Sequence, residues 1–447
     1  MSVEVKVMPD TPRNGARPGL VIRGMRGQAL LLATLGFFGG FAGVAVFGPL
    51  VPRFRDLLEL TPAAAALLAA TPNLTGSLLR IPFGASVDKY GGKRPFLVLL
   101  AITILGLAGL LWLLGTSYPN HMAGTYPLLL ALAMLIGCGI ATFSVGVGQV
   151  SYWFPKSEQG GALGTFGGIG NLSPGLSTML LPLAVASVGM ITGYSVWLII
   201  LVAITLIYAI FIHDAPVFQL LEAGIKPDPA QLAKLGGGET IPAGTPGAAL
   251  WTAARMPATW PLIGFYFMSF GGFMALTVWL PTYWHAMYNA PLGQAGLLTA
   301  TFSILAALVR AGGGILSDRL PIRFALAGNF LLMLAGFLAI SYSHTFSISL
   351  AATIALAIGM GLQNAIVFKL LPIYVPNAVG GASGLIGGLG ALGGFILPPV
   401  MGIATAWFGG PDAYARGFLP LAVLTVLALP NVFALDVWSR ARKVIIN

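Results

Sequence analysis

The sequence has few charges and almost no cysteine. Only 8% of its 447 residues are charged, against about 25% in soluble domains, which excludes a soluble globular fold. A single cysteine, Cys138, leaves no partner for a disulfide and no cysteine cluster for a metal. The N-terminal segment is polar and lacks the apolar core of a signal peptide. We therefore expect no cleaved leader, no metal and no cofactor.

Hydrophobic residues make up 57% of the chain, and the mean hydropathy is +0.88. Apolar runs of about 20 residues, the length of a membrane-spanning helix, recur along it. The alternation of apolar and polar residues that is typical of β-barrel strands is absent. The composition predicts an all-α polytopic membrane protein that is embedded in membrane lipid.

Charged and Pro/Gly/Asn-rich breaks divide the apolar sequence into twelve predicted transmembrane helices. The first six spans are 27–52, 62–86, 95–116, 125–152, 161–188 and 194–213. The second six are 258–284, 293–315, 323–342, 347–371, 379–407 and 417–438. The predicted fold is two pseudo-symmetric six-helix bundles.

Five regions follow from these spans. They are an N-terminal segment 1–26, a six-helix bundle 27–213, a linker 214–257, a six-helix bundle 258–438 and a tail 439–447. Pro and Gly in the linker argue against much regular structure there. The ends, the linker and alternate loops carry most of the Lys and Arg residues, so both termini and the linker are predicted to be cytoplasmic. The net charge of +10 is spread over these loops, and no basic patch indicates a nucleic-acid partner.

A motif in the second span returns in the eighth. The pattern R-x3-G-x3-D runs from Arg80 to Asp88 and again from Arg310 to Asp318. Two halves repeated in the same sense, with the substrate between them near the membrane centre, resemble the architecture of the major facilitator superfamily. The loop that contains Asp88 resembles the loop motif of that superfamily, and Asp318 stands at the matching place.

Arg80 and Arg310 are predicted to lie within the membrane, where charges are costly and mark substrate or ion paths. All thirteen Asp and Glu residues fall in termini or loops, so neither arginine has an acidic partner at its depth. The alternative is that each arginine extends to the membrane surface, over about 12 Å of helix. The matching placement favours two arginines that face one central cavity. Such a site needs an anion, and a planar guanidinium suits a small oxyanion.

Other side chains are candidates for the same cavity. Tyr266 and Phe270 share one helical face, and the phenol can donate to an anion. Phe143 is a candidate wall, Asn171 is a candidate donor, and Gly167 lies one turn before it. For a single aromatic residue in so apolar a chain, contact with lipid or core is the alternative role.

Two glycine-rich segments also match each other, "GGALGTFGGIGNL" from Gly160 and "GGASGLIGGLGAL" from Gly380. Small residues let transmembrane helices approach closely. We expect such close packing at Gly167, Gly168, Gly170, Gly387, Gly388 and Gly390.

Segments around these residues resemble the nitrate/nitrite porter family of the major facilitator superfamily. "SYWFPKSEQGGALGTFGGIGNLSPG" is similar to its first signature, and "GLQNAIVFKLLPIYVPNAVGGASGLIGGLGALGGFILP" to its second. The resemblance implies transport of nitrate and nitrite. The substrate residues that it implies are Arg80, Arg310, Tyr266, Phe270, Asn171, Gly167 and Phe143.

The sequence thus predicts an alternating-access transporter of nitrate and nitrite, without enzyme activity, monomeric, in a prokaryotic cytoplasmic (inner) membrane. Exchange of the two anions is favoured, because no Asp, Glu or His lies at the depth of the arginines to relay protons. The alternatives are a proton-coupled nitrate symporter and a carrier of another small anion. A membrane enzyme or receptor is a further alternative, without a supporting motif.

Overall fold

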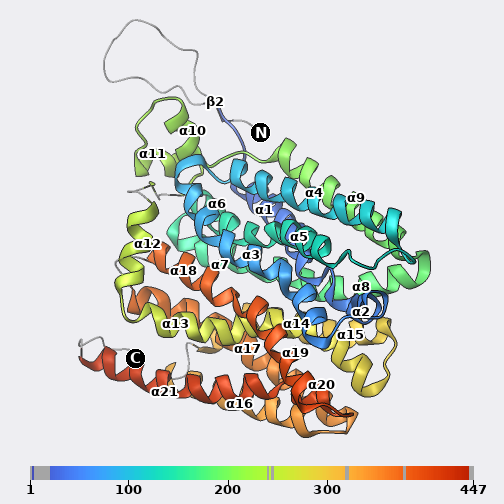
Figure 1. Cartoon of the computed structure of the whole chain (residues 1–447). Coiled ribbons are helices and arrows are strands. Elements are labelled where there is room, and N and C mark those ends of the chain that lie inside the picture. The colour runs from blue at the N-terminus through green and yellow to red at the C-terminus, as the bar shows by residue number, and fades with distance from the viewer. Residues whose placement is uncertain are drawn as a thin grey trace, which may run out of the picture.

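The computed structural model of the chain describes residues 3–4, 21–238, 241–242, 246–317, 322–375 and 379–441. These residues form a bundle of long helices with one two-stranded antiparallel sheet at its edge (Figure 1). The strands are β1 (Val3–Glu4) and β2 (Val21–Ile22). The predicted all-α membrane fold is confirmed.

Six segments form the N-terminal half, and several are broken into shorter helices. They are α1 (Arg26–Phe41) with η1 (Ala42–Ala45), η2 (Gly48–Leu50) and α2 (Val51–Leu58); α3 (Pro62–Tyr90); α4 (Lys93–Ser117); α5 (Tyr126–Gly137) with η3 (Cys138–Ala141) and α6 (Thr142–Trp153); α7 (Lys156–Gly170) with α8 (Leu172–Val188); and α9 (Met190–Phe211).

Six segments form the C-terminal half in the same manner. They are α13 (Thr259–Tyr266) with η4 (Phe267–Gly271) and α14 (Gly272–Tyr288); α15 (Leu292–Ser317); α16 (Ile322–Tyr342); α17 (Phe346–Tyr374); α18 (Val379–Ala391) with α19 (Gly393–Phe408); and α20 (Ala413–Arg416) with α21 (Leu419–Ala441).

Eleven of these twelve segments are long and apolar enough, within the described residues, to cross a membrane. The remaining segment is α3, which has 29 residues and is therefore long enough, since a span needs about 20. Its composition is more polar, because it contains Asn73, Ser77 and Arg80. All three of these side chains are buried inside the protein, away from lipid.

The linker is more regular than its Pro and Gly content predicts. It contains α10 (Pro216–Glu222), α11 (Pro229–Lys234) and α12 (Pro246–Arg255), each of which begins with a proline. Proline is favoured at the first position of a helix, because its fixed φ suits the helix and its missing N–H is not needed there. The prolines therefore start helices here, and the expectation of an irregular linker is wrong.

The three linker helices lie at one end of the bundle, which we call the linker end (Figure 1). Lys93 N donates to Asp214 Oδ1 at 2.9 Å, which places the end of α3 and the start of α4 there. The opposite end, where α3 begins at Pro62, is called the far end.

The two halves meet tightly at the far end. A Cβ on Gly402 of α19 would lie 2.8 Å from the Cα of Ala63 on α3. A Cβ on Gly48 of η2 would lie 2.9 Å from the Cα of Val278 on α14. Arg55 Nη1 also donates to the Tyr414 hydroxyl at 2.6 Å across the halves. These backbone approaches leave no space for an ion, so the far end is closed at these positions in this conformation.

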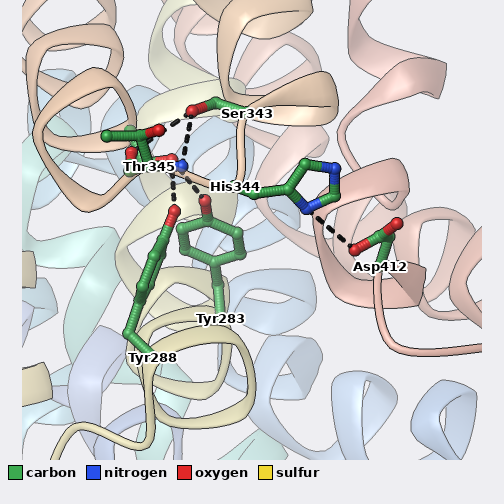
Figure 2. Close-up of polar contacts among 7 residues, drawn as sticks. Tyr283, Tyr288, Ser343, His344, Thr345 and Asp412 are labelled. Carbon is green, nitrogen blue, oxygen red and sulfur yellow. Dashed lines mark hydrogen bonds and ion pairs between the residues drawn. The ribbon is translucent and has the colours of Figure 1, made fainter.

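A polar cluster ties helix ends together in the C-terminal half (Figure 2). The hydroxyls of Tyr283 and Tyr288 contact Ser349 Oγ at 2.9 and 2.7 Å. In the loop between α16 and α17, His344 Nδ1 lies 3.1 Å from Asp412 Oδ1. This histidine and this carboxylate sit at a helix end, not at the depth of the predicted site.

Candidate functional site

Arg80 lies in α3 and is completely buried. Its Nη1 donates to the carbonyl oxygen of Gly387 in α18 at 3.2 Å, so this bond joins the two halves of the protein. Its Nε and Nη2 have no hydrogen-bond partner among the described residues. Buried polar groups are nearly always paired. The two free donors therefore indicate a place for a ligand that accepts hydrogen bonds.

Arg310 lies in α15 of the other half and is only partly buried. Its Nη1 donates to the hydroxyl of Tyr266 at 3.4 Å, so this tyrosine orients the guanidinium. Tyr266 comes from the end of α13 and is itself completely buried. Among the described residues, a backbone carbonyl thus positions Arg80 and a tyrosine hydroxyl positions Arg310.

Two aromatic rings lie beside both guanidinium groups. The Cζ of Arg80 is 5.0 Å from the ring centroids of Phe143 and of Phe270. The Cζ of Arg310 is 5.8 and 5.3 Å from the same two centroids. Cations within about 6 Å of an aromatic face are stabilised by its quadrupole. Because both arginines share these rings, they belong to one site.

Further rings support this pair. Tyr266 and Phe270 stack with centroids 4.9 Å apart and nearly parallel planes. Phe368 of α17 packs edge-on against Tyr266 and lies 5.9 Å from the Arg310 Cζ. Phe37 of α1 packs against Phe143 at 5.3 Å. Neither Phe368 nor Phe37 was predicted from the sequence, although Phe368 falls within the second signature segment.

The helix that carries Tyr266 and Phe270 contains a π-helical turn, η4. Such turns are rare and are often found at functional sites. This turn is pressed against α19, because a Cβ on Gly271 would lie 2.6 Å from the Cα of Gly393. Without side chains at these two glycines the backbones touch, which fixes Phe270 at the depth of the arginines.

Asn171 is buried at the joint between α7 and α8. Its Nδ2 donates to the Gly167 carbonyl at 2.6 Å, while its Oδ1 has no partner among the described atoms. A Cβ on Gly167 would lie 4.0 Å from a Phe143 ring carbon. Gly167 and Asn171 are therefore next to the Phe143 wall. The Asn171 amide donor is used within its own helix in this conformation.

Glycine packing differs among the predicted positions. A Cβ on Gly170 would lie 2.0 Å from the Phe37 ring, one on Gly388 2.6 Å from Ile81, and one on Gly390 2.7 Å from the Tyr266 ring. Gly168 is in ordinary contact, 3.6 Å from Ala311. The expectation of close packing is wrong for Gly387, because nothing lies within 4 Å of its Cβ position. Gly387 contributes its carbonyl instead.

Among the described residues, no acidic group forms an ion pair with either arginine. The ion pairs among the described residues are Arg26–Glu158, Arg94–Glu222 and His344–Asp412, none of which involves Arg80 or Arg310. Asp88 accepts a hydrogen bond of 2.7 Å from the Tyr152 hydroxyl at the linker end of α3. Asp318 lies outside the described residues. In the part of the chain that is described, no group of His, Cys, Asp or Glu is arranged to hold a metal.

A sequence model of the Major Facilitator Superfamily matches residues 33–398. The fold agrees with this match. The xylose transporter XylE from E. coli, in a partially occluded inward-open conformation, superposes with a TM-score of 0.69 at 15% identity. The superposition covers 91% of this chain and 96% of that one.

Curated relatives match most of the chain. The "Probable nitrate/nitrite antiporter NarK1" of Thermus thermophilus is 33% identical over 426 residues, which is 90% of each chain. The "Probable nitrate/nitrite transporter NarK2" of Mycobacterium tuberculosis is 32% identical over 90% of this chain and 95% of its own. The "Nitrite extrusion protein" of Bacillus subtilis is 29% identical over 92% and 93%.

Proposed function

Because the chain belongs to the nitrate/nitrite porter family of the major facilitator superfamily, we propose that it carries nitrate and nitrite across a membrane by alternating access. The observation that carries the proposal is the pair of arginines, one from each half, over the same two rings and without an acidic partner among the described residues. An anion between them offsets part of the positive charge that each half contributes.

The surroundings favour a small and planar anion. Phe143 and Phe270 are both within 6 Å of both guanidinium groups, so little width is left between the charged groups and the rings. A guanidinium donates in a planar fork, which matches the coplanar oxygens of nitrate and nitrite. A larger organic acid or phosphate ester would have to displace one of the rings.

Exchange of one anion for the other follows from the charge. Two desolvated positive groups repel each other strongly at low effective dielectric. In the empty carrier this repulsion opposes the approach of the halves that the switch between conformations requires. A bound anion removes part of the repulsion. The loaded carrier therefore changes conformation faster than the empty one, which is the condition for antiport.

We place the linker end in the cytoplasm. Basic residues gather there, as at Lys89, Lys93 and Arg94 around the end of α3, whereas Arg53, Arg55 and Arg416 are at the far end. Positive loops remain on the cytoplasmic side of membranes. The far end then faces outward from a prokaryotic cytoplasmic membrane, and the carrier acts as a monomer.

Transport of labelled nitrite into nitrate-loaded proteoliposomes tests the function. We expect rapid uptake that excess unlabelled nitrate or nitrite abolishes, because these anions fit the space between the arginines. Excess phosphate or a larger organic acid should leave it nearly unchanged. If phosphate or a larger organic acid competed as well as nitrate, the carrier would serve another anion. If the protein took up no nitrite, the proposed function would be wrong.

A further inference from the structure

Three polar residues form a stripe along α3 that includes more than the arginine. Asn73, Ser77 and Arg80 are spaced by four and three positions, which puts them on one helical face. All three are completely buried. From Arg80 the stripe runs toward the far end, with Ser77 about 5 Å and Asn73 about 10 Å along the helix axis.

The stripe carries four buried polar atoms without a hydrogen-bond partner among the described residues. They are Asn73 Oδ1, Ser77 Oγ, Arg80 Nε and Arg80 Nη2. The other Ser and Thr hydroxyls within this helix, those of Thr71, Thr75 and Ser86, are paired with backbone carbonyls, for example Thr71 Oγ1 with the Leu67 carbonyl at 2.7 Å. The Ser77 hydroxyl therefore differs from these in having no hydrogen-bond partner among the described residues. Buried polar atoms without a hydrogen-bond partner are rare in native proteins, and each one calls for an explanation.

The stripe faces the other half of the protein. Asn73 Nδ2 donates to the carbonyl of Gly394 in α19 at 3.0 Å. A Cβ on Gly388 in α18 would lie 3.2 Å from the Ser77 carbonyl oxygen. The contact between Asn73 and Gly394 lies on the far-end side of Arg80, and it separates when that end opens during alternating access. Opening frees the Asn73 amide and gives the Ser77 hydroxyl access to water or a ligand.

We propose that Asn73 and Ser77 form an outer subsite for the transported oxyanion, used when the far end is open. The Asn73 Nδ2 and Ser77 Oγ donate to the anion and pass it to the free Nε and Nη2 of Arg80. On closure, the Gly394 carbonyl takes the place of the anion at Asn73. The inference rests on the proposed function and adds to it the residues that the anion meets before the two arginines.

Sided exchange kinetics test the subsite. Proteoliposomes whose C-terminal tag is exposed are removed with an antibody, which leaves vesicles with the far end outward. Ser77→Ala and Asn73→Leu should raise the external nitrate concentration for half-maximal exchange by roughly tenfold, the loss expected for a hydrogen bond to a charged group. Asn73→Asp should raise it further, since a carboxylate repels the anion. The internal half-saturating concentration should not change.

Thr71→Val is the matched control, because the Thr71 hydroxyl is already paired within its helix. This variant should change neither the external nor the internal half-saturating nitrate concentration. Ser77→Ala decides the matter if the Asn73 variants do not fold, since it removes only an unpartnered hydroxyl. A purely structural role predicts no kinetic effect of that change. Equal effects on both sides, or none in Ser77→Ala, would overturn the subsite. Absence of exchange in the unaltered protein would instead overturn the proposed function.

Discussion

Replacing Arg310 with lysine should lower nitrate/nitrite exchange by roughly ten- to a hundredfold, the loss expected for charge-assisted hydrogen bonds. Lysine keeps the charge but loses the planar fork. It also lacks the guanidinium group that lies over Phe143 and Phe270 and donates to the Tyr266 hydroxyl. The initial rate of labelled nitrite uptake into nitrate-loaded vesicles measures the effect. Arg80→Lys should be at least as severe, because Arg80 is completely buried.

Arg255→Lys is the matched control for this change. Arg255 also lies over an aromatic ring, that of Trp251 at 4.6 Å, but it is exposed on α12 in the linker. The Arg255→Lys variant should exchange nitrate and nitrite at the rate of the unaltered protein. Normal exchange by Arg310→Lys, at equal amounts of protein in the membrane, would show that the anion needs only a positive charge. The proposed clamp would then be wrong.

Gly170→Ala should abolish most transport while the protein remains in the membrane. The added Cβ would lie 2.0 Å from the ring of Phe37, which is completely buried and packs against Phe143. The ring must move, and Phe143, which lies over both arginines, must move with it. Overpacking of this kind costs about 1–3 kcal/mol. Exchange rate and thermal stability of the purified protein together measure the result.

Gly164→Ala in the same helix is the control, because nothing lies within 4 Å of its Cβ position. It should exchange as the unaltered protein does. Equal activity of Gly170→Ala and Gly164→Ala would show that the aromatic rings behind Phe143 adapt freely. The position of the Phe143 ring would then not affect transport of the anion.

The sequence was sufficient for much of the fold, since apolar runs and basic loops are set by the membrane itself. It was less reliable where proline begins a helix, as in α10, because the same residue also breaks helices. The π-helical turn at Phe267–Gly271 has no signal in composition or periodicity. It depends on a backbone contact with Gly393, which only the tertiary structure reveals.

The candidate site was predicted in part. Arg80 and Arg310 stood out because charges within a membrane are costly, and the structure brings both to Phe143 and Phe270. The role of the Gly387 carbonyl was not predicted, because a glycine in a small-residue helix indicates only packing. Phe368 and Phe37 were also missed. With 26 phenylalanines in the chain, no single one is distinguished by sequence alone.

The dependence of nitrite uptake on nitrate inside the vesicle tests the central claim, that a bound anion must offset part of the charge of the two arginines before the carrier can switch between its two conformations. Nitrate-loaded proteoliposomes should take up labelled nitrite rapidly, and empty ones should take up almost none, with or without an inward proton gradient. No carboxylate accompanies Arg80 or Arg310 among the described residues to carry a proton in place of the exchanged anion. Rapid proton-driven uptake into empty vesicles would contradict the account and show a symporter instead.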